Sequence, residues 1–345
     1  HRTKIIKCLP EGVAKPLHLS GTPSGQNKHW TANMAQITAL NRTAASSLCF
    51  GCMQFGGTAT QENSQAMYEA CRESEVNFFD TAHAYTGGAS ETLLGAFAAQ
   101  ERDALLIATK VAYVGGSGRA NILRTFDESR KRLGFDMVDI LYLHRWDPDT
   151  PLEETFGTLT ELQHTGKIRY IGVSNFSAWQ VMKAQAVAEE LGSRIDIIQP
   201  MYSLVKRQAE VELLPMASAE GMAVAAYSPL GGGLLTGKYH RGETGRLSTD
   251  QRYGARYGQD WMRHTASALL DVSARLNVTP ATLAVAWVRR HSAITAPIIS
   301  ARNVDQLRPS LAAQSLRLSD EDYAVIEGLS PRPAPATDRL EEAAS

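Results

Sequence analysis

The sequence has few of the features that define fibrous, disordered or disulfide-stabilised proteins. Four of its 345 residues are cysteine and 7% are aromatic, whereas 43% are hydrophobic and 21% are charged. This composition excludes long disorder, a collagen repeat and a disulfide scaffold for most of the chain. A globular chain of this length can bury most of its apolar surface without such cross-links.

Long apolar runs and an excess of one charge are also missing. No run reaches the ~18 apolar residues that a membrane-spanning helix needs, and the formal net charge is −1. Residues 1–33 carry five Lys or Arg and one Glu, so the remainder is mildly acidic. We therefore expect no nucleic acid and no membrane as partner. The basic stretch lacks an apolar segment, so we expect no secretory signal and a cytoplasmic protein with reduced cysteines.

The cysteines include one C-x-x-C motif, formed by Cys49 and Cys52. This spacing suits a redox or metal-binding pair, but a redox pair of this type opens a helix, and these residues are typical of a strand end. No second pair of Cys or His has the spacing of a zinc site. We interpret both cysteines as small buried side chains and expect no bound metal.

The two ends of the chain differ from its middle. Residues 1–33 show no periodicity, and we interpret them as a disordered extension or an expression remnant ahead of a natural start at Met34. Residues 331–345 begin with alternating prolines and are expected to form a flexible tail. Residues 34–330 are expected to form a single domain, because no boundary interrupts their pattern.

Short β-branched runs alternate with longer amphipathic stretches throughout this domain. Several runs are apolar at every position, which is typical of parallel strands buried on both faces. Eight strand-helix units in one series predict a (β/α)8 barrel, or TIM barrel. An open doubly wound sheet would place G-x-G-x-x-G after its first strand, which the sequence lacks there. The expected strands cover residues 48–51, 77–80, 105–110, 138–143, 168–174, 195–201, 222–228 and 294–300.

Two further segments flank the strand-helix units. Before the first strand, residues 37–42 and 44–48 are expected to form a β-hairpin that closes the bottom of the barrel. The seventh strand is followed by an insertion, residues 239–262, which is rich in Gly, Arg and Tyr and has no helical period.

Polar signals mark two helix starts clearly. A helix is expected over residues 177–191, with a capping box formed by Ser177 and Gln180. Thr279 followed by Pro280 is typical of another helix start.

Three of the expected strands end in a polar residue, and a fourth polar residue lies in the loop after one of these strands. Asp80, Lys110 and His144 end the second, third and fourth strands, and Tyr85 follows Asp80 by five positions. In a barrel, the C-terminal ends of the strands share one mouth, where function gathers. We therefore expect these four side chains to meet.

The chemistry of this set favours proton transfer. A phenol ionises near pH ~10, and a neighbouring ammonium makes it a stronger acid. Asp80 can supply the counter-charge for the buried Lys110, and a neutral imidazole can orient a carbonyl oxygen. The four residues could protonate an oxygen on which negative charge develops. Paired glycosidase carboxylates, G-x-S-x-G and H-E-x-x-H are absent.

The motifs around these residues resemble those of the aldo-keto reductase superfamily, in particular its bacterial branch related to potassium-channel β-subunits. The resemblance covers about residues 36–329 and implies that Tyr85 is the general acid, assisted by Lys110 and Asp80. It further implies that His144 positions a carbonyl group and that a nicotinamide cofactor provides hydride. The matching motifs are Asp80-Thr-Ala-x-x-Tyr85, Ala108-Thr-Lys110, Tyr142-Leu-His144, Gly172-Val-Ser-Asn175, Tyr227-Ser-Pro-Leu-Gly-Gly-Gly-Leu-Leu-Thr-Gly-Lys-Tyr239 and Ser300-Ala-Arg302.

The residues that would hold the nicotinamide and pyrophosphate lie after strands five to seven. Ser174, Asn175 and Gln199 could bind the carboxamide, and Tyr227 could stack on the nicotinamide ring. The glycine-rich loop lets backbone amides approach the pyrophosphate, to which Lys238 adds charge. Its expected cofactor contacts are Ser228, Pro229, Leu230 and Gly232.

The adenosine end would lie after the eighth strand. Ser300 and Arg302, followed by a helix that contains Gln306, suit a 2′-phosphate and favour NADPH over NADH. The family often has Glu-Asn near the adenine, where this chain has Pro309 and Ser310, so use of NADH stays open.

The expected substrate contacts are Met53, Phe55 and Trp146, together with the 239–262 insertion. Their apolar character suits aldehydes and modest aromatic or aliphatic ketones as small-molecule substrates. The main functional hypothesis is an NADPH-dependent reductase of aldehydes and ketones. The alternatives are an NAD(P)-dependent dehydrogenase of a sugar or other alcohol, and a cofactor-binding regulatory subunit. An oligomer is compatible with the sequence, which does not identify the natural substrate.

Overall fold

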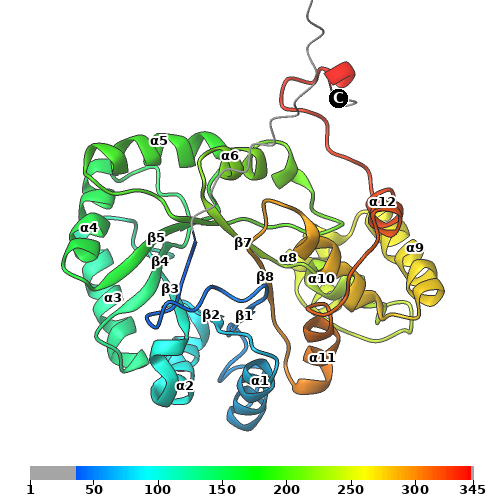
Figure 1. Ribbon diagram of the computed structural model, residues 1–345, viewed down its shortest axis with the longest axis horizontal. Coiled ribbons are helices and arrows are strands. Elements are labelled where there is room, and N and C mark those ends of the chain that lie inside the picture. The colour runs from blue at the N-terminus through cyan, green and yellow to red at the C-terminus, as the bar shows by residue number, and fades with distance from the viewer. Residues whose placement is uncertain (1–35, 343–345) are drawn as a thin grey trace, which may run out of the picture. The chain divides into compact units, whose positions relative to one another are not determined.

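Parallel strands pair side by side and close on themselves, because the last strand bonds to the first (Figure 1). The computed structural model describes residues 36–342. The predicted (β/α)8 barrel is confirmed, with strands four and five at the expected residues, strand three shifted by one residue and the other strands shorter. The strands are β1 (Cys49–Gly51), β2 (Phe78–Asp80), β3 (Leu106–Val111), β4 (Val138–Leu143), β5 (Ile168–Ser174), β6 (Ile197–Gln199), β7 (Ala223–Tyr227) and β8 (Ala296–Ile299).

Helices surround the strands on all sides (Figure 1). The capping box before α5 is present, since the Ser177 amide donates to Gln180 Oε1 at 2.8 Å. Pro280 begins α10 behind the predicted Thr279 cap. The helices are α1 (Gln61–Glu73), α2 (Ala89–Ala98), α3 (Arg119–Leu133), α4 (Leu152–His164), α5 (Ala178–Glu190), α6 (Leu213–Ala219), α7 (Arg246–Thr249), α8 (Gln251–Tyr257), α9 (Asp260–Leu276), α10 (Pro280–Arg290), α11 (Val304–Ala312) and α12 (Asp320–Glu327).

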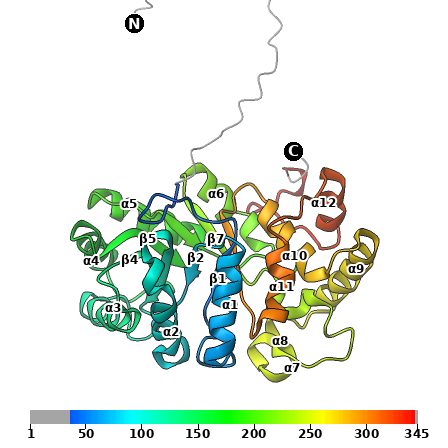
Figure 2. The same cartoon turned by 60° about the horizontal axis from the view of Figure 1, so that its bottom comes forward.

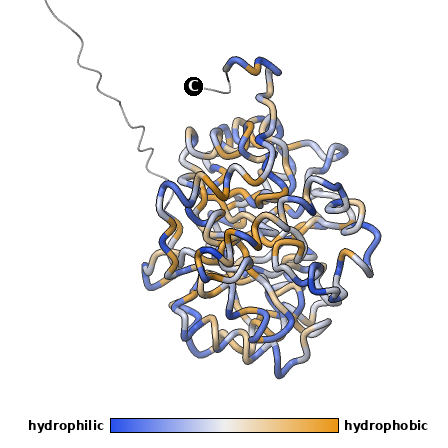
Figure 3. Tube along the Cα trace, turned by 90° about the vertical axis from the view of Figure 1, so that its right-hand side faces the viewer, coloured by the Kyte–Doolittle hydropathy of each residue, from blue (hydrophilic) through white to orange (hydrophobic). Residues whose placement is uncertain are grey.

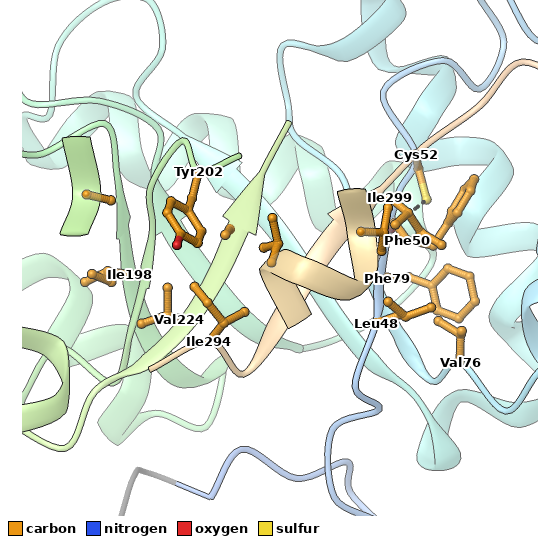
Figure 4. Close-up of a cluster of buried hydrophobic side chains, with 14 of the residues drawn as sticks. Leu48, Phe50, Cys52, Val76, Phe79, Ile198, Tyr202, Val224, Ile294 and Ile299 are labelled. Carbon is orange, nitrogen blue, oxygen red and sulfur yellow. Dashed lines mark hydrogen bonds between the residues drawn. The ribbon is translucent and has the colours of Figure 1, made fainter. Parts of the chain in front are cut away.

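Alternating side chains divide the apolar residues into two cores. Phe78, Leu106 and Ala108 point into the barrel, where they pack in one cluster. Their neighbours along the chain face the helices and form a larger cluster, which leaves polar residues mostly on the outer loops (Figure 3). This outer cluster includes Leu48, Phe50, Cys52, Val76, Phe79, Ile198, Tyr202, Val224, Ile294 and Ile299 (Figure 4).

The segment before β1 closes the bottom of the barrel, as predicted, but its hairpin is reduced to a single antiparallel bridge between Thr38 and Ala44. Ile37 and Ala39 join the interior cluster and are nearly inaccessible to solvent. Arg169 donates to the Thr38 carbonyl at 2.6 Å. Two backbone hydrogen bonds also join the arms of this hairpin, from the Ala39 amide to the Thr43 carbonyl at 2.8 Å and from the Ala45 amide to the Ile37 carbonyl at 2.9 Å.

Residues 239–262 show no helical period in the sequence, yet the short helices α7 and α8 lie inside this insertion. Asp250 caps α8 by accepting from the Arg252 amide at 2.9 Å, and Tyr257 is fully buried. Such short helices depend on capping and packing, which periodicity does not reveal. Figure 2 shows α7 and α8 at the opposite end of the barrel from the segment that precedes β1.

The expected extension, residues 1–33, lies outside the described residues. From 331 onward, the described chain has no regular structure before a short turn at Leu340–Glu342. Among residues 36–342, no helix has the length and apolar character to cross a membrane.

Two helical glycines make opposite predictions about stability. A Cβ at Gly95 in α2 would overlap the Leu133 carbonyl of α3, whereas one at Gly157 in α4 would meet nothing within 4 Å. Gly95→Ala should therefore lower the free energy of unfolding by about 1–3 kcal/mol. Gly157→Ala should raise it by about 0.5–1 kcal/mol through helix propensity. Urea unfolding of both variants tests this, and equal effects would contradict the close approach of α2 and α3.

Candidate active site

A buried ion pair lies at the C-terminal ends of β2 and β3. Lys110 Nζ lies 2.5 Å from Asp80 Oδ2 and donates to the Thr81 carbonyl at 2.8 Å. The Lys110 side chain is 0% exposed. Gln199, at the end of β6, donates to the other carboxylate oxygen of Asp80 at 2.9 Å. Three inward-facing strand ends thus hold two opposite charges away from water.

This pairing keeps Lys110 charged. Burial alone lowers the pKa of an ammonium, but the negative charge of Asp80 and the neighbouring Tyr85 outweigh it, so the pKa of Lys110 is raised. A positive charge therefore stands inside the mouth at neutral pH.

Tyr85 lies over this charge. Its ring centroid is 5.1 Å from Lys110 Nζ, and its amide donates to the Ala82 carbonyl at 3.0 Å in a tight turn after β2. Burial raises the pKa of Tyr85, whereas Lys110 lowers it, by its charge and by a hydrogen bond, and Asp80 raises it. The effect of Lys110 has the predicted sign, but burial is stronger, so the phenol stays protonated and can donate a proton.

His144 faces Tyr85 from the end of β4. The two ring centroids are 5.7 Å apart and nearly perpendicular. Burial, followed by the charges of Lys110 and Arg145, lowers the pKa of His144 to about 3. Its Nδ1 is buried without a hydrogen-bond partner among residues 36–342. The imidazole is therefore neutral at physiological pH, as its predicted positioning role requires.

A second polar network fixes the loop that carries Tyr85 from outside the barrel. The buried carboxylate of Glu91 accepts from Thr109 Oγ1 at 2.6 Å and pairs with Arg132 at 3.1 Å. Arg132 also donates to the carbonyl of His83, whose ring bonds to Glu128. The loop is thereby tied to β3 and α3, and His83 points away from the mouth.

The residues expected to hold a nicotinamide lie beside this set. Asn175 donates to the His144 carbonyl at 2.9 Å and accepts from the Tyr227 hydroxyl at 2.7 Å. The Ser174 hydroxyl donates to the carbonyl of Gln199 at 3.0 Å. The C-terminal ends of β5, β6 and β7 are thus linked by polar contacts to the tetrad of Asp80, Tyr85, Lys110 and His144. Asn175 uses both ends of its amide within the protein.

The glycine-rich loop follows β7 through Ser228, Pro229 and Leu230. Gly232 has a φ of 66° and packs so closely on Tyr253 and Tyr257 that a Cβ would clash. Glycine is therefore required here for its backbone conformation and for the close approach of the insertion.

A cluster of cations lies next to this loop. Burial lowers the pKa of Lys238, and the nearby charges of Arg302 and Arg246 lower it further. Ser300 Oγ is buried without a partner among the described residues, and Gln306 lies near the start of α11. Clustered cations and a free hydroxyl suit the phosphates of a dinucleotide, so these residues fit the expected cofactor.

The expected substrate residues Met53, Phe55 and Trp146 lie in the loops after β1 and β4. Met53 is half-buried after β1, and Trp146 packs on Phe176 and Trp179 at 5.2 and 5.7 Å. The Phe55 ring is fully buried between β1 and α2, where it packs on other phenylalanines, and its contact with a substrate stays a prediction. The turn after Cys52 directs the Phe55 side chain into the outer cluster.

Tyr113 and Arg145 were not named in the sequence analysis, and Tyr253 was named only as part of the 239–262 insertion. Tyr113, 44% exposed, lies 4.7 Å from the His144 ring, and Arg145 lies over Tyr113. Tyr253 of α8 influences the pKa of Tyr85. Tyr113 and Arg145 stand in loops directly after strands, a position that could have identified them. Only the fold of the insertion could have identified Tyr253.

A closed parallel barrel whose mouth combines a phenol, an ammonium and an imidazole is the architecture of a (β/α)8 enzyme. The chain belongs to the Aldo/keto reductase family, which matches residues 47–331 and confirms the resemblance seen in its motifs.

Named relatives support an oxidoreductase. Norsolorinic acid reductase of Emericella nidulans is 32% identical, covering 86% of this chain and 81% of its own. An aryl-alcohol dehydrogenase of Pestalotiopsis microspora is 31% identical, covering 82% and 78%. A probable voltage-gated potassium channel subunit beta of Arabidopsis thaliana is 32% identical, covering 78% and 87%.

The environment of His144 predicts an unusual titration. Because its pKa is lowered to about 3, its imidazole resonances should not shift between pH 5 and pH 8 in proton NMR. An ordinary histidine titrates near pH ~6.5. His144→Gln assigns the resonance by its loss. A midpoint near the ordinary value would contradict the buried, cation-flanked position described above.

Proposed function

We propose that the protein is an NADPH-dependent reductase that converts aldehydes and ketones to alcohols. The observation that carries this proposal is the buried Lys110–Asp80 ion pair beneath Tyr85, with a neutral His144 opposite. In this arrangement, a protonated phenol, a cation and a neutral hydrogen-bonding ring surround one point of the mouth. This position suits the oxygen of a carbonyl group, which becomes the hydroxyl oxygen of the alcohol product.

The residues of the chain supply the proton in this reaction. A bound nicotinamide would supply hydride to the carbonyl carbon. The Tyr85 hydroxyl donates its proton to the carbonyl oxygen, and the Lys110 ammonium stabilises the phenolate that remains. His144 holds the same oxygen by a hydrogen bond. Water then returns a proton to Tyr85.

The cofactor would be held along the ends of β5 to β8. Ser174, Asn175, Gln199 and Tyr227 would hold the nicotinamide, and the glycine-rich loop with Lys238 would hold the pyrophosphate. Ser300, Arg302 and Gln306 would hold the adenosine phosphate. The unpartnered Ser300 hydroxyl and the neighbouring cations support this assignment and the preference for NADPH.

The same residues can work in reverse as an alcohol dehydrogenase, since proton transfer between phenol and alkoxide is reversible. The aryl-alcohol dehydrogenase among the relatives supports testing this direction. The channel subunit among the relatives supports a regulatory alternative, but the complete tetrad favours turnover. We propose a cytoplasmic setting, because Cys49, Cys52 and Cys71 are free thiols.

Removal of one hydroxyl tests the proposed acid. Tyr85→Phe should lower kcat for benzaldehyde reduction by about a hundredfold or more, because the proton donor is lost. Binding of NADPH, measured by fluorescence, should be nearly unchanged. Tyr170→Phe is the matched control, since its hydroxyl bonds to Thr38 at the other end of the barrel. Substantial activity in Tyr85→Phe would refute the assignment.

The proposed 2′-phosphate contact makes a separate prediction. Arg302→Ala should raise KM for NADPH by about tenfold or more and change KM for NADH little, because only NADPH carries the extra phosphate. Steady-state kinetics with both cofactors provide the measurement. Arg317→Ala removes an exposed arginine whose guanidinium bonds to the Gln314 carbonyl and should change neither. Equal effects of Arg302→Ala on both cofactors would count against the assignment.

A further inference from the structure

One guanidinium at the mouth has no assigned contact with substrate or cofactor. Arg145 follows His144 directly and is exposed. Its Cζ lies 5.1 Å from the centroid of the Tyr113 ring, and that ring lies 4.7 Å from the ring of His144. His144 in turn faces Tyr85. A fixed positive charge therefore lies one aromatic ring away from the residues that would hold a carbonyl oxygen.

The charge of Arg145 acts on Asp147, but the two side chains form no ion pair among residues 36–342. Within residues 36–342 its guanidinium forms neither an ion pair nor a hydrogen bond, whereas the exposed Arg119 pairs with Glu161. Asp147 is close in sequence, but Ser117 N at 2.6 Å and Thr150 Oγ1 at 2.7 Å engage its carboxylate. The donors of Arg145 are thus available to a ligand.

The cations beside the expected cofactor site lie elsewhere. Lys238, Arg246 and Arg302 belong to the segments after β7 and β8, whereas Arg145 follows β4, on the side of His144. A second guanidinium, that of Arg256, lies 5.5 Å from the Tyr253 ring and forms no ion pair among the described residues. Positive charge therefore borders the mouth beyond the expected phosphate positions.

We propose that Arg145 recognises the substrate, by binding a carboxylate on an aromatic aldehyde or ketone whose ring packs against Tyr113. The planar guanidinium can donate two parallel hydrogen bonds to a carboxylate, and its stacking on Tyr113 holds it in place. The half-exposed Tyr113 ring offers an apolar face for an aryl group beside the point where the carbonyl is held. This inference rests on the proposed function, whose substrate class it narrows.

The test compares an acid with its uncharged ester. The substrates are 2-, 3- and 4-formylbenzoate, each paired with its methyl ester, and the readout is the ratio of kcat/KM for acid over ester. At least one pair should favour the acid by about tenfold in the native protein, as a charge-assisted hydrogen bond would give. Arg145→Met should bring this ratio near one. Arg317→Met, at the other end of the barrel, should preserve it.

Failure of this inference can be separated from failure of the proposed function. If the esters are reduced but no acid is preferred, or if Arg145→Met keeps the preference, the inference is overturned while the reductase stands. If nothing is reduced, the proposed function fails, and calorimetric binding of 4-(hydroxymethyl)benzoate and its methyl ester decides the inference. Tighter binding of the acid that disappears in Arg145→Met supports it, and equal binding overturns it.

Discussion

The ion pair between Lys110 and Asp80 is the interaction on which the rest of the site depends. Moving two charges out of water costs several kcal/mol each, so the pair persists only where its remaining hydrogen-bonding capacity is met. Here the Thr81 carbonyl and the Gln199 amide complete it. The barrel makes this possible because three strands end at one place. The resulting fixed charge acts on both neighbouring rings, Tyr85 and His144.

The scaffold and the site are parts of one alternating pattern. Along β3, Leu106, Ala108 and Lys110 point inward in turn, so the same pleat that fills the barrel also raises a charge to its mouth. The other end of the barrel holds none of the candidate site residues, and apolar side chains from the segment before β1 close it. Stability and reactivity are therefore separated along the barrel axis, and the loops at the mouth can differ without disturbing the core.

The strands and the tetrad could be predicted from the sequence because each is a local signal. A buried parallel strand is an apolar run, and a polar residue that closes such a run must lie at the mouth. Phe55 could not be placed this way, since a turn decides whether its ring faces the core or the substrate. The helices around Tyr253 depend on capping and tertiary packing. Arg145 was visible in the sequence, but only the structure shows that its guanidinium lies over Tyr113 and forms no ion pair among residues 36–342.

The most direct test of the central claim is the ionisation of Tyr85 itself. Carbon NMR of protein labelled at the tyrosine Cζ can follow this phenol, with Tyr85→Phe to assign its signal. If the buried ammonium acts on Tyr85 as described, the Tyr85 phenol will ionise at a higher pH in the Lys110→Met variant than in the native protein. It will also ionise at a higher pH in the double variant that carries both Lys110→Met and Asp80→Asn. An unchanged midpoint in both variants would contradict the account.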